Sequence, residues 1–158
     1  MKGVALYTAH MEKVQLADIG AFAKKILESL ASARDESATI VALSGELGAG
    51  KTTFTQALAR ELGVADVVQS PTYVLMKNYD ISKNTAVPFS KLIHIDAYRL
   101  DAPEQFGALD PASFLDDPHN LVVVEWPERL QGVLPTPNLV IKFSSDDAKE
   151  NERYYDIS

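Results

Sequence analysis

The sequence predicts an α/β fold with three layers, in which helices cover a mostly parallel central sheet. Three short apolar runs support this prediction, because each has the length and composition of a strand buried on both faces. The first run leads into a glycine-rich loop and then a helical stretch, which is the kind of connection that parallel strands need. The three runs are residues 39–44, 92–96 and 121–125.

Helical periodicity predicts one helix before the first run and one after it. Apolar residues recur at helical spacing over residues 16–31, which predicts an amphipathic helix that ends in the polar run 32–37. Residues 51–62 form the second predicted helix, which Gly63 ends. The order strand, glycine-rich loop, helix therefore surrounds residues 45–50.

The middle of the chain is predicted to be less regular. Residues 73–79 are expected to form a strand and residues 80–90 a polar loop. Pro103, Pro111 and Pro118 interrupt the stretch between the second and third apolar runs, so this stretch is expected to form turns or one-turn helices.

The C-terminal part is predicted to close the sheet as an antiparallel edge. Residues 139–143 and 154–157 are expected to pair as a hairpin, with the charged stretch 146–152 as its solvated turn. Because 158 residues are the usual length of one domain, we expect residues 1–158 to form a single domain.

The composition excludes several classes of function. A formal net charge of −7 argues against tight unaided binding to nucleic acid, since that affinity comes largely from Lys and Arg. The absence of cysteine excludes disulfides and thiolate metal sites. No apolar run is long enough to span a bilayer, and the N-terminus lacks the apolar core of a signal peptide, so we expect no membrane insertion.

The glycine-rich loop has the spacing of a phosphate-binding motif. Residues 43–54 read LSGELGAGKTTF and fit G-x-x-x-x-G-K-[ST]. Backbone N–H groups at a helix N-terminus bind phosphate, Lys51 can reach the β and γ oxygens, and the Thr52 hydroxyl can be a ligand of Mg²⁺. The alternative is a non-binding turn with this spacing by chance. The predicted phosphate-binding residues are Gly45, Leu47, Gly48, Ala49, Gly50, Lys51, Thr52 and Thr53.

Two carboxylates end the second and third apolar runs. Phosphate-loop proteins commonly supply Mg²⁺ with an acid from the end of a neighbouring strand. The run before Glu125 is the more uniformly apolar, so Glu125 is the better candidate, beside Thr52, for the metal site. Asp96 could orient the attacking water or hold a Mg²⁺-bound one, and we assign it, with Lys51, as a catalytic candidate. The alternative for either acid is the capping of a loop.

The sequence lacks the features that identify other classes of phosphate-loop protein. The guanine-reading motif [NT]-K-x-D is missing, since residues 77–80 read KNYD. A small-molecule kinase needs several arginines in a lid, and a motor ATPase needs a further domain, whereas this short chain has five Arg in all. These comparisons favour a minimal ATPase that works for a partner protein, while a small-molecule phosphotransferase and a non-hydrolysing nucleotide-binding adaptor remain open alternatives.

Four motifs in order resemble the TsaE family, also called YjeE, of small bacterial ATPases in tRNA threonylcarbamoyladenosine synthesis. The motifs are GELGAGKTT at 45–53, SPTY at 70–73, HIDAYRL at 94–100 and VEWPER at 124–129. Four ordered motifs are far more specific than a phosphate loop alone. They cover the chain from about residue 43 to residue 129.

The resemblance implies a cytoplasmic ATPase that uses ATP and Mg²⁺ and acts with the TsaB and TsaD proteins. TsaD transfers a threonylcarbamoyl group to adenosine 37 of tRNA, and the ATPase supports turnover of the complex, so tRNA would be met only indirectly or within the complex. At the positions that match the family's motifs, Lys51 and Thr52 would bind phosphates and Mg²⁺. Glu125 would be the Mg²⁺-linked acid, Asp96 the acid essential to hydrolysis, and residues 70–73 the nucleotide-responsive segment.

Further residues in these motifs are candidates for nucleotide-responsive or transition-state roles. Arg99 and Arg129 could neutralise transition-state charge, with surface ion pairing as the alternative for each. Trp126 could form a wall of the nucleotide site or pack in the core. The candidates are Ser70, Thr72, Arg99, Trp126 and Arg129.

Two positions receive no functional assignment from the sequence. His94, between Ile93 and Ile95, is expected to be a core or strand histidine with its hydrogen bonds satisfied. Leu16 stands where members of the resembling family often carry a Thr near the nucleotide base, so we predict no base contact there.

Overall fold

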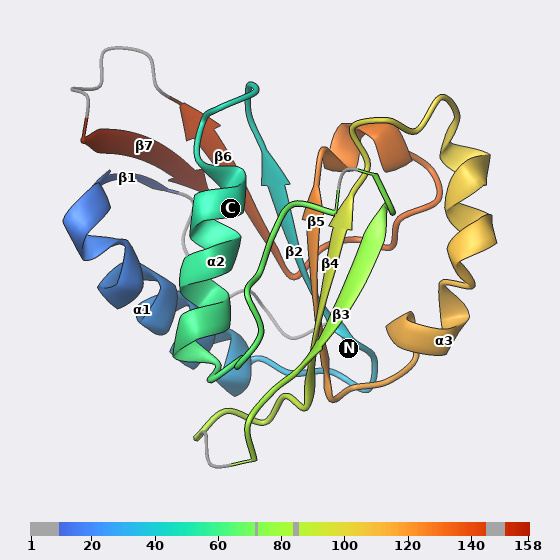
Figure 1. Ribbon diagram of the computed structural model, residues 1–158, viewed down its shortest axis with the longest axis horizontal. Helices are drawn as coiled ribbons and strands as arrows, with labels where there is room; N and C mark the ends of the chain where they lie inside the picture. Colours follow the sequence, from blue (N-terminus) through green and yellow to red (C-terminus); the bar gives the residue numbers. More distant parts are fainter. Residues whose placement is uncertain (1–9, 72, 84–85, 145–150) are drawn as a thin grey trace.

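The computed structural model describes residues 10–71, 73–83, 86–144 and 151–158, and its centre is one seven-stranded sheet (Figure 1). The strand order is β1-β7-β6-β2-β5-β4-β3. The strands are β1 His10–Gln15, β2 Thr39–Ser44, β3 Met76–Asp80, β4 Lys91–Asp96, β5 Asn120–Glu125, β6 Leu139–Ser144 and β7 Glu152–Ile157.

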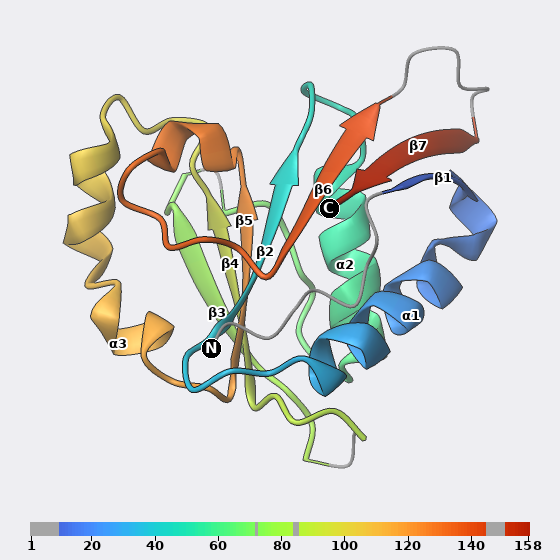
Figure 2. The ribbon, with the colours of Figure 1, turned by 180° about the vertical axis from the view of Figure 1, so that it is seen from behind.

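Helices lie on both faces of this sheet, which confirms the predicted three-layer α/β fold (Figure 1). Helices α1 and α2 cover one face, and α3, η2 and η3 cover the other (Figures 1 and 2). None of the helices in the described ranges is long and apolar enough to cross a membrane. The helices are α1 Ile19–Ser32, α2 Lys51–Glu61 and α3 Ala112–Leu115, with the 3₁₀ helices η1 Leu16–Asp18, η2 Pro103–Leu109 and η3 Pro127–Leu130.

The centre of the sheet is parallel. Strand β2 pairs in parallel with β5 and β6, and β5 pairs in parallel with β4. The register sets Leu43 beside Glu125 and Glu125 beside Asp96. Because parallel strands end at the same edge of a sheet, the glycine-rich loop after β2 and both strand-end acids meet at one edge.

The two ends of the sheet are antiparallel. Strand β3 pairs with β4 at one end, and β6 and β7 form the predicted C-terminal hairpin at the other. Strand β1, which the sequence did not predict, pairs with β7 and forms the outermost strand there. Most of the predicted hairpin turn, residues 145–150, lies outside the described part of the chain.

Each face of the sheet has its own apolar core. On the α1 and α2 face, Phe22, Phe54, Phe143 and Tyr155 form an aromatic cluster with ring centroids 4.6 to 6.3 Å apart. On the other face, Phe106 of η2 packs edge-on against α3, and Ile93, Ile95, Val122 and Val124 complete that core. The alternation along β4 therefore sends Ile93 and Ile95 to one face and leaves Leu92, His94 and Asp96 for the α2 face.

Two predicted elements begin later than the sequence suggested. The first helix begins with a 3₁₀ turn, η1, before α1 starts at Ile19. The strand predicted from residue 73 was wrong at its start, because β3 begins only at Met76. Val74 closes a turn by donating its N–H to the Pro71 carbonyl, and Leu75 has φ 64°, which an extended strand does not allow.

Candidate nucleotide-binding site

The glycine-rich loop passes close to the neighbouring strand at its first glycine. Gly45 has φ 137°, and a Cβ at this position would lie 2.7 Å from the Phe143 carbonyl oxygen. Only glycine fits this conformation and this approach without a shift of the backbone. The loop then ends at Gly50, the N-cap of α2, which has φ 105°. The first amides of an eleven-residue helix therefore point out of the loop with no partners from the helix itself.

Lys51, the first residue of α2, is almost fully buried. Its ammonium donates hydrogen bonds to the carbonyl oxygens of Gly45 at 2.7 Å and Glu46 at 2.8 Å, and it lies 4.3 Å from the centre of the Trp126 ring. Burial lowers the pKa of Lys51 below its usual value, and the charges of Glu125, Glu128 and Asp96 oppose this shift. The lysine thus folds back over its own loop, between the loop carbonyls and an aromatic ring.

Glu125 contacts two side chains from two other elements. The Thr52 hydroxyl donates to Glu125 Oε1 at 3.0 Å, and the His94 Nε2 lies 2.9 Å from the same oxygen. Glu125 is 3% exposed and His94 is 0% exposed, so this contact is shielded from bulk water. The carboxylate at the end of β5 is therefore held between the N-terminus of α2 and the middle of β4.

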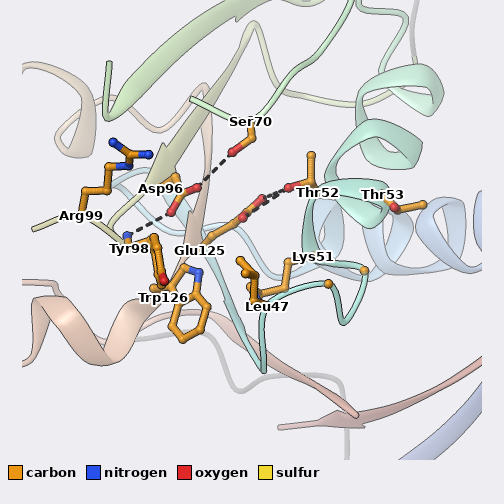
Figure 3. A pocket seen from close by; sticks show the side chains of 12 residues that line it. Leu47, Lys51, Thr52, Thr53, Ser70, Asp96, Tyr98, Arg99, Glu125 and Trp126 are labelled. Atoms are coloured by element: carbon orange, nitrogen blue, oxygen red, sulfur yellow. Dashed lines mark hydrogen bonds between the residues drawn. The ribbon is translucent and has the colours of Figure 1, made fainter. Parts of the chain in front are cut away.

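Asp96 is held by different groups (Figure 3). The Ser70 hydroxyl donates to its Oδ2 at 3.0 Å, and the Tyr98 backbone N–H donates to its Oδ1 at 3.0 Å. The side chain is buried at the end of β4. Asp96 therefore connects the loop that precedes β3 with the turn that follows β4.

An aromatic wall closes one side of the site. Trp126 has φ 60°, unusual for a bulky residue, and Pro127 follows it at the start of η3. Its ring packs against Tyr98 with a centroid distance of 5.0 Å. At the same edge of the sheet, the Arg99 guanidinium lies 4.5 Å from the centre of the exposed Tyr73 ring.

These residues surround one cleft of about 470 Å³ at the carboxyl ends of the parallel strands (Figure 3). Among the predicted site residues, Gly45, Ala49 and Arg129 do not line it, and Thr72 lies outside the described residues. Arg129 is exposed on η3. The lining residues are Leu47, Gly48, Gly50, Lys51, Thr52, Thr53, Ser70, Asp96, Tyr98, Arg99, Glu125 and Trp126.

The oxygen atoms of the cleft suit a magnesium ion better than a transition metal. Two buried carboxylates and the Thr52 hydroxyl supply hard ligands, and cysteine is absent from the chain. No group of three or more His, Cys, Asp or Glu with metal-binding geometry occurs in the residues that the structure describes. Mg²⁺ commonly takes one or two protein ligands and completes its shell with waters and phosphate oxygens, so Thr52 and Glu125 could hold it.

Two lining or supporting residues were not assigned from the sequence. Tyr98 lines the cleft, and its backbone N–H holds Asp96. His94 is not the fully satisfied core histidine that we expected, because its Nδ1 has no hydrogen-bond partner in the described residues. The alternation of a strand would have indicated that His94 shares a face with Asp96, but not that Glu125 lies beside it.

The comparison with known proteins decides the family. The sequence profile described as "Threonylcarbamoyl adenosine biosynthesis protein TsaE" matches residues 14–154, which is most of the chain. This chain belongs to the TsaE family. Membership confirms the resemblance carried by the four motifs and assigns the chain to tRNA threonylcarbamoyladenosine biosynthesis.

Relatives in the TsaE family cover most of the chain. The tRNA threonylcarbamoyladenosine biosynthesis protein TsaE of Haemophilus influenzae is 35% identical over 133 residues, which cover 83% of this chain and 79% of that protein. The Bacillus subtilis protein of the same name is 34% identical, covering 80% and 75%. The crystal structure of Bacillus subtilis YdiB matches with a TM-score of 0.62 and 27% identity, covering 96% of this chain and 86% of YdiB.

Proposed function

We propose that this chain is a Mg²⁺-dependent ATPase that acts with the TsaB and TsaD proteins in the synthesis of N6-threonylcarbamoyladenosine at position 37 of tRNA. The observation that carries the proposal is the meeting of the phosphate loop, the Thr52–Glu125 pair and Asp96 in one cleft. The family and the names of its members support the pathway. A cytoplasmic location is part of the same proposal.

The phosphates of ATP would bind at the N-terminus of α2. The amides of the glycine-rich loop and of the first helical turn are the donors, and the helix dipole favours the negative charge. An ammonium group has three N–H donors, and the loop carbonyls of Gly45 and Glu46 accept from two of them. Lys51 can therefore serve a phosphate oxygen while it still holds the loop.

Thr52 and Glu125 would hold Mg²⁺ beside these phosphates. Both are oxygen ligands, they already contact each other, and one lies on the first turn of the phosphate-binding helix. When bound, the ion would neutralise charge on the phosphate oxygens. Glu125 is buried, and among the described residues its one possible cationic partner at hydrogen-bond distance is His94, which is charged only if protonated. A bound cation would therefore offset the free-energy cost of burying this carboxylate.

Asp96 would orient the water that attacks the γ-phosphate. Its two oxygens are fixed by Ser70 and Tyr98, so the carboxylate cannot rotate freely, and a fixed acceptor next to the cleft can align a water molecule. Among the described residues, Arg99 is the one arginine that lines the cleft, and its guanidinium stacks over the Tyr73 ring. Few cations therefore face the phosphates, and we expect slow hydrolysis by the isolated chain and faster or productive hydrolysis with partner proteins.

The test of this function is co-purification of the chain with candidate TsaB and TsaD proteins, with and without ATP, followed by an assay for modified tRNA. We expect a complex whose amount depends on ATP, and modified tRNA that accumulates beyond one round only when the chain is present. Lys51→Ala is compared with the wild-type chain in the same assay, because it removes a donor of the phosphate loop and leaves Asp96 and Glu125 unchanged. The absence of any complex, with or without ATP, would contradict the proposed partners.

A further inference from the structure

His94 is a polar residue in a place where the strand otherwise buries apolar side chains. It is 0% exposed, and Leu92, two residues earlier on the same face of β4, is equally buried and apolar. An imidazole buried without full hydrogen bonding costs stability relative to an apolar side chain. A histidine at this position therefore needs a reason other than filling the core.

Among the residues that the structure describes, the histidine makes one side-chain hydrogen bond. Its Nε2 lies 2.9 Å from Glu125 Oε1, whereas its Nδ1 is buried without a partner in the described residues. An ionised carboxylate only accepts hydrogen bonds, so the nitrogen that faces Glu125 must carry the proton. In the neutral ring the bare lone pair is then on Nδ1, and His94 is a fixed donor to Glu125.

We propose that His94 is a positioning residue for the metal site, and this inference rests on the proposed role of Glu125 as a Mg²⁺ ligand. Thr52 reaches the same carboxylate from α2, with its hydroxyl 3.0 Å from Oε1 and 3.4 Å from Oε2. The His94 N–H approaches Oε1 from β4, so the carboxylate is held from two elements and its torsions are restricted. Hydrogen bonds donated to a metal-binding carboxylate orient it and raise metal affinity.

Two substitutions separate the hydrogen bond from the volume of the side chain. His94→Leu replaces the imidazole with an apolar side chain of similar size, like the buried Leu92 on the same face, and it has no donor. His94→Gln keeps an N–H donor at a similar reach from the backbone, so it should restore the contact with Glu125. Ile93→Val, on the opposite face of the same strand, is the control for a small general change in β4.

The measurement is metal affinity, not ATP turnover. The full chain is saturated with ADP and titrated with Mn²⁺, and the free ion is followed by its electron paramagnetic resonance signal; ADP affinity in the presence of a chelator is measured separately by calorimetry. We expect His94→Leu to weaken Mn²⁺ binding by about 10- to 100-fold, with metal-free ADP affinity unchanged to within about twofold. His94→Gln should recover most of the loss, and Ile93→Val should match the wild type.

Three results would overturn the inference. The first is Mn²⁺ binding by His94→Leu that equals the wild type. The second is a parallel loss of metal-free ADP affinity, which would indicate a general structural role, and the third is a failure of His94→Gln to recover any Mn²⁺ affinity. If the wild-type chain with ADP shows no saturable Mn²⁺ binding, the proposed metal site itself is wrong. This outcome is distinct from the other three because it is seen in the wild-type protein, without any substitution.

Discussion

Asp96 and Glu125 are register partners at the ends of neighbouring parallel strands, yet they are held by different parts of the chain. Asp96 accepts hydrogen bonds from Ser70 and from the Tyr98 backbone, in the segments on either side of β3 and β4. Glu125 contacts Thr52 on α2 and His94 within β4. Glu125 is thus tied to α2, whereas Asp96 is tied to Ser70, the first residue of the SPTY segment.

The first prediction concerns the charge of Glu125. Glu125→Gln keeps an oxygen that can accept from both Thr52 and His94, so the fold should be retained, but it removes the negative charge that would bind the metal. We expect Mg²⁺ to improve ATP affinity much less in this variant than in the wild type, with the difference exceeding about 10-fold. Calorimetric titration with ATP, once in Mg²⁺ and once in a chelator, measures the ATP affinity of each protein under the two conditions. An unchanged benefit from Mg²⁺ would exclude Glu125 as a ligand.

The second prediction compares two glycines of the same loop. Gly48→Ala forces a residue with a Cβ to φ 79° but meets open space, so we expect it to lower the free energy of unfolding by about 1 to 2 kcal/mol. Gly45→Ala adds a clash with the Phe143 carbonyl oxygen at 2.7 Å, and we expect a further loss of about 1 to 3 kcal/mol. Urea unfolding measures the difference. Equal losses would show that the close approach to β6 carries no cost.

The third prediction concerns alkaline pH. Burial raises the pKa of Tyr155 to about 12, against the opposing charge of Arg153, so the folded chain holds this proton more tightly than the unfolded chain does. The stabilisation is complete below a pH of about 10, the unfolded pKa, and is lost as the pH rises towards 12. Tyr155→Phe should remove this part of the alkaline destabilisation.

The control for this experiment is Tyr154→Phe, which removes a hydroxyl from the half-buried neighbour on β7. Free energies of unfolding are compared at neutral pH and at a pH of about 11. The wild type and the control should lose more stability over this interval than Tyr155→Phe. An equal loss in all three proteins would show that Tyr155 ionises no differently in the folded and unfolded chains.

The fourth prediction uses Trp126, the single tryptophan of the chain. The Lys51 ammonium lies 4.3 Å from the centre of its ring, and phosphate oxygens would draw that ammonium towards the cleft. ATP should therefore change the Trp126 emission. Lys51→Ala should shift the emission of the free protein and abolish most of the response. Identical emission from Lys51→Ala and wild type before ATP is added would contradict the contact.

The sequence predicted the fold best where local pattern and burial agree. Strand β2 is buried over nearly its whole length and has the predicted bounds, and α2 begins at the predicted Lys51. Strand β1 was not predicted because only Val14 of its six residues is buried. Its pairing depends on β7, and Gln15 donates to Glu152, which lies far along the chain.

The candidate site was predicted in its parts but not in its contacts. Motif spacing indicated the phosphate loop, and two acid-tipped strands indicated Asp96 and Glu125. The hydrogen bonds from Ser70 and His94 could not be predicted, because they join residues 26 and 31 positions apart whose meeting depends on loop path and register. The motif also placed Arg129 among the candidates, but this residue is exposed on η3 and does not line the cleft.

The hydrolytic role that we propose for Asp96 is tested most directly by phosphate release in the presence of TsaB and TsaD proteins. Asp96→Asn can still accept from the Tyr98 N–H and contact Ser70, so the cleft should keep its shape. We expect phosphate release to fall by about 100-fold or more while ATP affinity changes by less than about threefold, since an oriented acid or base typically contributes factors of this size. Phosphate release by Asp96→Asn at the wild-type rate would contradict the proposed mechanism.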